Sequence, residues 1–180
     1  MWHASTQCWT ASWPSLNENT CCAEKAEMIL QEVDDVIKNY QGVSRKVLDY
    51  SLLMKRMVGL AKQPGFSAGS WKPLEDMVDV DNFVRVGNFK EVMNWQDYVG
   101  FLTSWASSAE WECSFKRITE TGNTVFLELE ERSRYGEFRS VVNSVSVYEF
   151  NRAGKICHLD IYLQMELPQP EMLQSYGDQL

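Results

Sequence analysis

Two side chains near the end of the sequence have the chemistry to move protons: His158 and Asp160. They alternate with Leu159 and Ile161, and such alternation in a β-strand places both polar side chains on one face, about 7 Å apart. If that face lines an apolar cavity, burial raises the pKa of the carboxyl and Asp160 acts as a general acid or base, with the imidazole as its partner. The open alternative is an outer face, with Asp160 in solvent or in a dimer contact and His158 without a catalytic role.

A second group of side chains is suited to holding a small organic molecule. These candidates for substrate binding are Tyr50, Arg85, Trp95, Tyr98, Asn143 and Tyr162. Asn143 interrupts a row of valines on a predicted strand, and a buried amide without a partner costs about 1 to 3 kcal/mol, so it must bind a ligand group or a protein group. The alternatives are a solvated position for Arg85 and a core position for Trp95.

Other kinds of chemistry lack support in the sequence. The two histidines, His3 and His158, stand far apart, and the five cysteines are irregularly spaced, so no metal-ligand pattern forms. There is no glycine-rich phosphate loop, and no cysteine has a base nearby. We therefore expect no metal, no cofactor and no covalent catalysis, and any chemistry should be acid-base work.

Charge and composition restrict the partners and the location. The chain has 180 residues with 17 basic and 25 acidic side chains, giving a formal net charge of -8. A field of this sign repels phosphate backbones, so we expect neither nucleic acid nor membrane as a partner. The odd number of cysteines and the lack of a secretory signal pattern predict reduced thiols and a cytoplasmic protein.

Helical periodicity governs the first part of the chain and strand alternation the second. Apolar spacing predicts helices over residues 20–42, from Ser44 to Pro64, over residues 71–79, and from the capping residue Asn94 through Trp105. A short strand is expected over residues 83–86, and four antiparallel strands between Ser108 and Gln164. Residues 1–19 are expected to form a tail, 20–42 an additional helix, 43–168 the main domain and 169–180 a second tail.

This order of elements predicts an α+β fold in which helices pack on one face of a curved antiparallel sheet and leave a pocket at its open end. Three stretches carry a family resemblance: residues 77–85, residues 94–105, and the ending over residues 145–162 with its Gly154-Lys155-Ile156 turn. They resemble the NTF2-like, SnoaL-like proteins, which include polyketide cyclases, ketosteroid isomerase and limonene epoxide hydrolase. The resemblance implies a cone of curved sheet on a long N-terminal helix with two to three further helices, and a homodimer.

In that family the acid of the last strand can face the cavity, which implies a catalytic role for Asp160. The chain departs from the hydrolase pattern, because residues 130–134 contain no Arg-x-Asp pair, and it offers a single credible acid where the isomerase pattern needs two. The leading hypothesis is an acid-base enzyme, a cyclase, isomerase, dehydratase or hydrolase, acting on a small and largely apolar molecule. The alternatives are a binding module without turnover and a dimeric interaction scaffold whose cone is filled by its own side chains.

Overall fold

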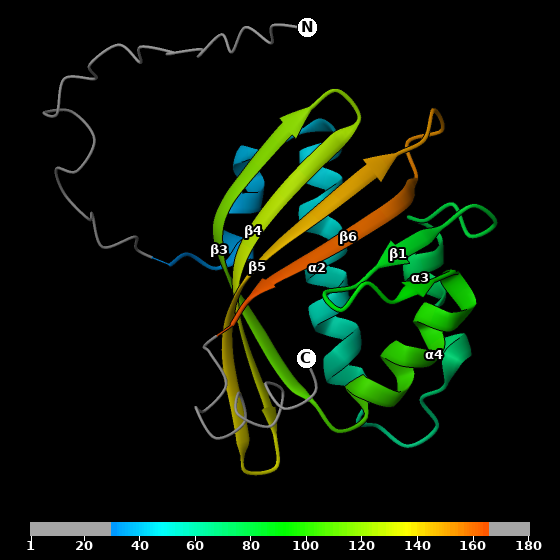
Figure 1. Ribbon diagram of the computed structural model, residues 1–180, viewed down its shortest axis with the longest axis vertical. Helices are drawn as coiled ribbons and strands as arrows, with labels where there is room; N and C mark the ends of the chain where they lie inside the picture. Colours follow the sequence, from blue (N-terminus) through cyan, green and yellow to red (C-terminus); the bar gives the residue numbers. More distant parts are fainter. Residues whose placement is uncertain (1–29, 166–180) are drawn as a thin grey trace, which may run out of the picture.

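Six strands form one curved sheet in the order β2-β1-β6-β5-β4-β3 (Figure 1). The computed structural model describes residues 30–165. The strands are β1 (Val84–Val86), β2 (Val92–Met93), β3 (Glu110–Thr121), β4 (Thr124–Tyr135), β5 (Phe138–Phe150) and β6 (Ile156–Gln164). Strands β3 to β6 are an antiparallel meander, as the alternation predicts, and β1 joins β6 in parallel.

The helices come before β1, apart from the last one, which lies between β2 and β3. They are α1 (Val33–Val36), the 3-10 turn η1 (Ile37–Asn39), α2 (Gly42–Leu60), the 3-10 turn η2 (Ala68–Trp71), α3 (Lys72–Glu75) and α4 (Trp95–Ala106). In Figure 1 the long α2 crosses behind the sheet, while α3 and α4 lie beside β1. We call the sheet face that packs on α2 the inner face and the opposite one the outer face.

The first turn of α2 is fixed by a carboxylate from the sheet. Glu120 on β3 accepts hydrogen bonds from the backbone N–H of Ser44, at 3.2 Å, and from its hydroxyl, at 2.6 Å. A negative charge is favourable here because the helix N-terminus presents unpaired N–H groups and a partial positive charge. The contact therefore sets the position of α2 against the far end of the sheet.

The core lies between α2, α3, α4 and the inner face. Its fully buried side chains include Leu48 and Val58 of α2, Trp71 of η2, and Leu127 and Leu159 of the sheet. The indole N–H of Trp71 donates to the hydroxyl of Thr103 on α4 over 2.9 Å, so a polar atom buried among apolar groups keeps its partner. These contacts fix α4 relative to the helices that precede it.

Several predicted boundaries change. The part of the predicted helix 20–42 that the structure describes contains the short α1 and η1 and the first residue of α2, and Gln31 forms a β-bridge with Phe115 instead of a helical turn. The helix expected over residues 71–79 ends at Glu75, and the two-residue strand β2 is an addition. The expected tails, residues 1–19 and 169–180, lie outside the described residues. The α+β fold itself is confirmed.

None of the helices in residues 30–165 has the length and apolar character needed to cross a bilayer. The expected cytoplasmic location stays a prediction.

Candidate functional site

Four elements bring three tyrosines and an arginine together on the inner face. Tyr50 comes from α2, Arg85 from β1, Tyr98 from α4 and Tyr148 from β5, and all four are at most 5% exposed. The sheet register explains part of this, since Leu159 on β6 lies opposite both Arg85 and Tyr148. We call these four residues the tyrosine–arginine cluster.

Aromatic rings hold the cluster in place. The rings of Tyr50 and Tyr148 meet edge to face with centroids 5.8 Å apart. The guanidinium carbon of Arg85 lies 5.2 Å from the centroid of the Tyr98 ring and 5.3 Å from that of Phe101. A cation close to two aromatic rings is stabilised by their quadrupoles, more strongly where water is excluded. Trp95 packs edge to face against Tyr98, with ring centroids 6.1 Å apart.

Three buried polar atoms on this side have no hydrogen-bond partner among residues 30–165. They are the hydroxyl of Tyr50, Nε of Arg85 and the hydroxyl of Ser144. Ser144 lies on the same side of β5 as Tyr148, four residues before it, so it also faces inward. A buried donor or acceptor left unsatisfied costs about 1 to 3 kcal/mol, and most such groups in proteins have a partner. The inner face thus carries unused hydrogen-bonding capacity.

Burial changes the acidity of the tyrosines. Desolvation raises the pKa of Tyr50 well above its usual value, helped by Tyr98 and Tyr148 and opposed by Arg85. It also raises the pKa of Tyr98, against the influence of Arg85, and that of Tyr148. The Tyr98 hydroxyl contributes to the raised pKa of Tyr50, but the two hydroxyls lack the geometry of a hydrogen bond, so the Tyr50 hydroxyl has no partner among the described residues. All three phenols stay protonated at neutral pH and remain available as donors.

The predicted catalytic pair lies on the other side of the sheet. Leu159 is buried against the core, so the alternating His158 and Asp160 project from the outer face. His158 Nε2 and Asp160 Oδ1 lie 2.8 Å apart, with side chains 30% and 26% exposed. The sequence was compatible with either face for Asp160, and in the structure Asp160 lies on the outer face. The expectation that this pair works inside the cone is therefore corrected.

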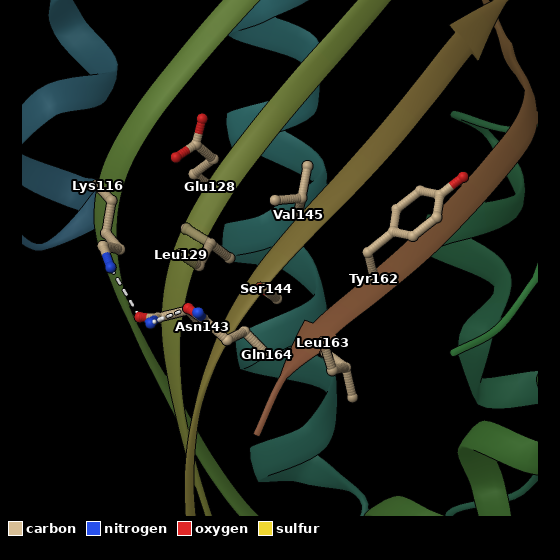
Figure 2. A pocket seen from close by; sticks show the side chains of 9 residues that line it. All are labelled: Lys116, Glu128, Leu129, Asn143, Ser144, Val145, Tyr162, Leu163 and Gln164. Carbon is tan, nitrogen blue, oxygen red and sulfur yellow. Dashed lines mark hydrogen bonds between the residues drawn. The ribbon is translucent and has the colours of Figure 1, made fainter. Parts of the chain in front are cut away.

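Asn143 and Tyr162 also belong to the outer face. Figure 2 shows them at a shallow hollow of about 270 Å³ on the side of the sheet away from α2. The Asn143 carbonyl accepts from Lys116 Nζ at 2.7 Å, and its amide donates to Gln164 at 2.9 Å, so the amide has protein partners. Of the six predicted binding residues, four lie together on the inner side: Tyr50, Arg85, Trp95 and Tyr98. Asn143 and Tyr162 lie apart from them on the outer face.

Sequence reasoning missed three inner-face or rim residues. Tyr148 shares the site, Glu131 on β4 accepts the indole N–H of Trp111 at 2.8 Å, and Glu91 forms an ion pair with Arg85 at 3.1 Å. A signal for Glu131 exists, because it continues the alternation of Leu127 and Leu129. Glu91 has no such signal, since it lies in the short connection between β1 and β2.

One sequence pattern bears on the expectation against covalent catalysis. Residues 65–69 read Gly-Phe-Ser-Ala-Gly, which matches the Gly-x-Ser-x-Gly pattern of serine hydrolases. That pattern requires a turn from a strand into a helix, and Ser67 instead precedes η2, where its backbone N–H donates to the Ser70 hydroxyl. It borders a second hollow of about 450 Å³, lined by Leu53, Met57, Leu60 and Phe66 among others, which does not include the tyrosine–arginine cluster. The match is therefore a turn motif.

Within residues 30–165 no three His, Cys, Asp or Glu side chains gather in an arrangement that would hold a metal ion. The expectation that the chain uses no metal and no cofactor stays a prediction.

Comparison with known proteins agrees with this architecture. An NTF-2 like protein of unknown function from Pseudomonas aeruginosa superposes with a TM-score of 0.50 at 14% identity, over 66% of this chain and 98% of that one. The chain has the NTF2-like fold. This confirms the fold that the resemblance implies. No family model and no curated protein matches the sequence.

Two further structural neighbours carry names that suggest activities. An LEH-like epoxide hydrolase from M. tuberculosis has a TM-score of 0.46 at 15% identity, over 62% of this chain and 84% of that one. A putative isomerase of the SnoaL-like family from Agrobacterium tumefaciens has a TM-score of 0.46 at 12% identity, over 64% and 98%. At such identities the likeness concerns the fold alone.

Proposed function

We propose that this chain binds a small organic molecule inside its NTF2-like cone, with the tyrosine–arginine cluster as the binding surface. The observation that carries the proposal is the set of unpaired buried atoms: Tyr50 OH, Arg85 Nε and Ser144 Oγ. Hydrogen bonds from a ligand would satisfy these atoms and remove their desolvation penalty. The surrounding rings of Tyr98, Tyr148 and Phe101 would contact the apolar part of that ligand.

Binding without turnover fits the geometry better than the acid-base enzyme. Asp160 and His158 project from the outer face, on the side of the sheet away from the cluster. If a carboxylate on the inner face acted as acid or base, the candidate would be Glu131. Its Oε2, however, already accepts the Trp111 indole N–H at 2.8 Å. A general base must reach the proton it removes, and Glu131 would first have to release this bond.

The proposal is tested by what the purified protein carries. The full chain is expressed, purified and extracted with organic solvent, and the extract is compared by mass spectrometry with that of a Tyr50→Phe variant. We expect a compound that co-purifies with the unaltered chain and is depleted in Tyr50→Phe, because the variant removes one unpaired hydroxyl without changing the ring. An Asp160→Asn variant serves as the outer-face control and should retain the compound. Loss of the compound from Asp160→Asn, together with full retention in Tyr50→Phe, would contradict the proposal.

We also propose a homodimer formed by the outer face. Val141 and Tyr162 are each 58% exposed on this face, where half-buried Val145 and Val147 continue the apolar row. Apolar side chains gathered on one exposed face mark an interaction surface, and a two-fold dimer pairs such a face with itself.

Light scattering coupled to size exclusion tests the dimer. The expected mass of the unaltered chain is twice 20.8 kDa. Val141→Asp should shift it to the monomer, because each two-fold contact would have to remove two carboxylates from water at an apolar surface. The matched control is Leu60→Asp, an exposed apolar position at the end of α2, which should remain dimeric. A monomer for the unaltered chain at high protein concentration would rule the dimer out.

A further inference from the structure

The buried guanidinium of Arg85 already holds one carboxylate, that of Glu91 in the connection between β1 and β2. Arg85 Nη1 lies 3.1 Å from Glu91 Oε1, and the two side chains are 7% and 35% exposed. A charge at the depth of Arg85 needs an opposite charge, since an isolated ion is very costly to remove from water. This position in the cone is therefore built to hold an anion.

Glu91 uses only part of what the guanidinium offers. Nη1 makes the contact with Glu91 and a longer one of 3.7 Å to Met93 Sδ, while Nε has no partner among residues 30–165. A guanidinium presents its N–H groups as a planar fork that matches the two oxygens of a carboxylate with parallel hydrogen bonds. A second carboxylate that reached Nε and Nη2 together would use the fork that Glu91 leaves free. Because two carboxylates at one guanidinium repel each other, its binding would weaken the contact between Glu91 and Nη1.

Glu91 can leave Arg85 without opening the core. Its other oxygen accepts the backbone N–H of Phe89 at 3.0 Å, within the same short connection, and its side chain is partly solvated. A Cβ at position 87 would overlap the Glu91 carboxylate, so the glycine leaves the room in which Glu91 folds onto Arg85. The ion pair is thus a local contact within this connection. When the pair separates, water can solvate the Glu91 carboxylate.

The surroundings of Arg85 also favour a particular shape. Its guanidinium carbon lies within 5.3 Å of the centroids of both Tyr98 and Phe101. Phe101 is 40% exposed, so one ring beside the buried charge can still be reached from solvent. An apolar ring attached to a carboxylate would lie against Phe101 while its charged end meets Arg85.

We infer that the ligand of the cone is a small apolar carboxylate, aromatic by preference, which displaces Glu91 from Arg85. The inference rests on the proposed binding function and adds the chemical class of the ligand and its route of entry. Glu91 then acts as an internal competitor that neutralises Arg85 while no ligand is bound.

Calorimetric titration of the full chain with two matched probes tests the inference. The probes are 2-naphthoate and 2-naphthamide, which share size and ring but differ in charge. We expect the carboxylate to bind and the amide to bind at least tenfold more weakly. Glu91→Gln should raise the affinity for 2-naphthoate by about tenfold, because it removes a charged competitor. Gly87→Ala should act in the same direction by pushing the Glu91 carboxylate aside. Glu112→Gln, an equal charge change on exposed β3, should leave the affinity unchanged.

Each outcome separates the inference from the proposed function. Equal binding of both probes would overturn the carboxylate class and leave binding in the cone supported. Binding of neither probe would overturn both. Weaker binding of 2-naphthoate to Glu91→Gln and Gly87→Ala would overturn displacement of Glu91. Because Glu91→Gln leaves Arg85 without its partner, circular dichroism checks its fold, and 2-naphthoate should raise its melting temperature more than that of the unaltered chain. If Glu91→Gln is unfolded, Gly87→Ala alone decides.

Discussion

At the scale of single residues, Cys113 shows what the inner face does to an ionisable group. Its side chain is 1% exposed on β3, and burial raises the pKa of the thiol to about 12, with Glu131 adding to the shift. In an unfolded chain the pKa of a thiol is about 8.5. The folded protein therefore keeps a proton that the unfolded chain loses.

The sign of the pH effect follows from this difference. Below the unfolded pKa both states are protonated and the stabilising contribution is fully present. As the pH rises toward 12, the unfolded state is favoured by up to about 1.4 kcal/mol per pH unit for this one group. We expect the free energy of unfolding, from urea titrations between pH 8 and 10.5, to fall less steeply in Cys113→Ala than in the unaltered chain. Cys157→Ala, at a half-buried thiol, should reduce the slope less, and identical slopes in all three proteins would contradict the account.

At the scale of elements, α4 begins where the sequence predicts. Asn94 Oδ1 accepts the backbone N–H of Asp97 at 2.9 Å, which satisfies one of the free N–H groups of the first turn. Because α4 carries Tyr98 and Phe101, its start fixes two rings of the site. The local signal worked because a cap depends on neighbours only three residues away.

Removal of this cap should weaken the protein measurably. We expect Asn94→Ala to lower the free energy of unfolding by about 1 kcal/mol, since the freed N–H group loses its acceptor. Chemical denaturation followed by circular dichroism measures the change. The exposed Gln96→Ala on the same turn is the control and should remain within about 0.5 kcal/mol of the unaltered chain. A loss in Gln96→Ala as large as in Asn94→Ala would show that the cap is not the cause.

The strands show where sequence reasoning stops. The alternation of apolar and polar residues from Ser108 onward predicts all four long strands. It divides their side chains between two faces, but it does not indicate which face packs against the helices. On β5 the valine row, with Val141, lies outside, and the side with Ser144 and Tyr148 lies inside. Contacts with α2, distant in the sequence, decide between them. The missed strand β2 has only two residues, too few for any period.

At the scale of the whole molecule, the proposed binding surface exists only after folding. Tyr50, Arg85 and Tyr98 are identifiable as candidates from the sequence, yet their meeting with Tyr148 depends on the curvature of the sheet around α2. Because Leu159 faces the core, the alternating His158 and Asp160 project outward. The fold was predictable because its elements are strongly periodic, and the division of the candidates between two faces was not, because it depends on packing.

Side-chain nuclear magnetic resonance tests the central claim most directly. The Nε–H signal of Arg85, assigned with Arg85→Lys, and the imidazole signals of His158, assigned with His158→Asn, report on the inner and outer faces in one titration with 2-naphthoate. The account predicts that the Arg85 signal shifts to saturation while the His158 signals stay in place. Saturating shifts at His158 with an unmoved Arg85 signal would contradict it.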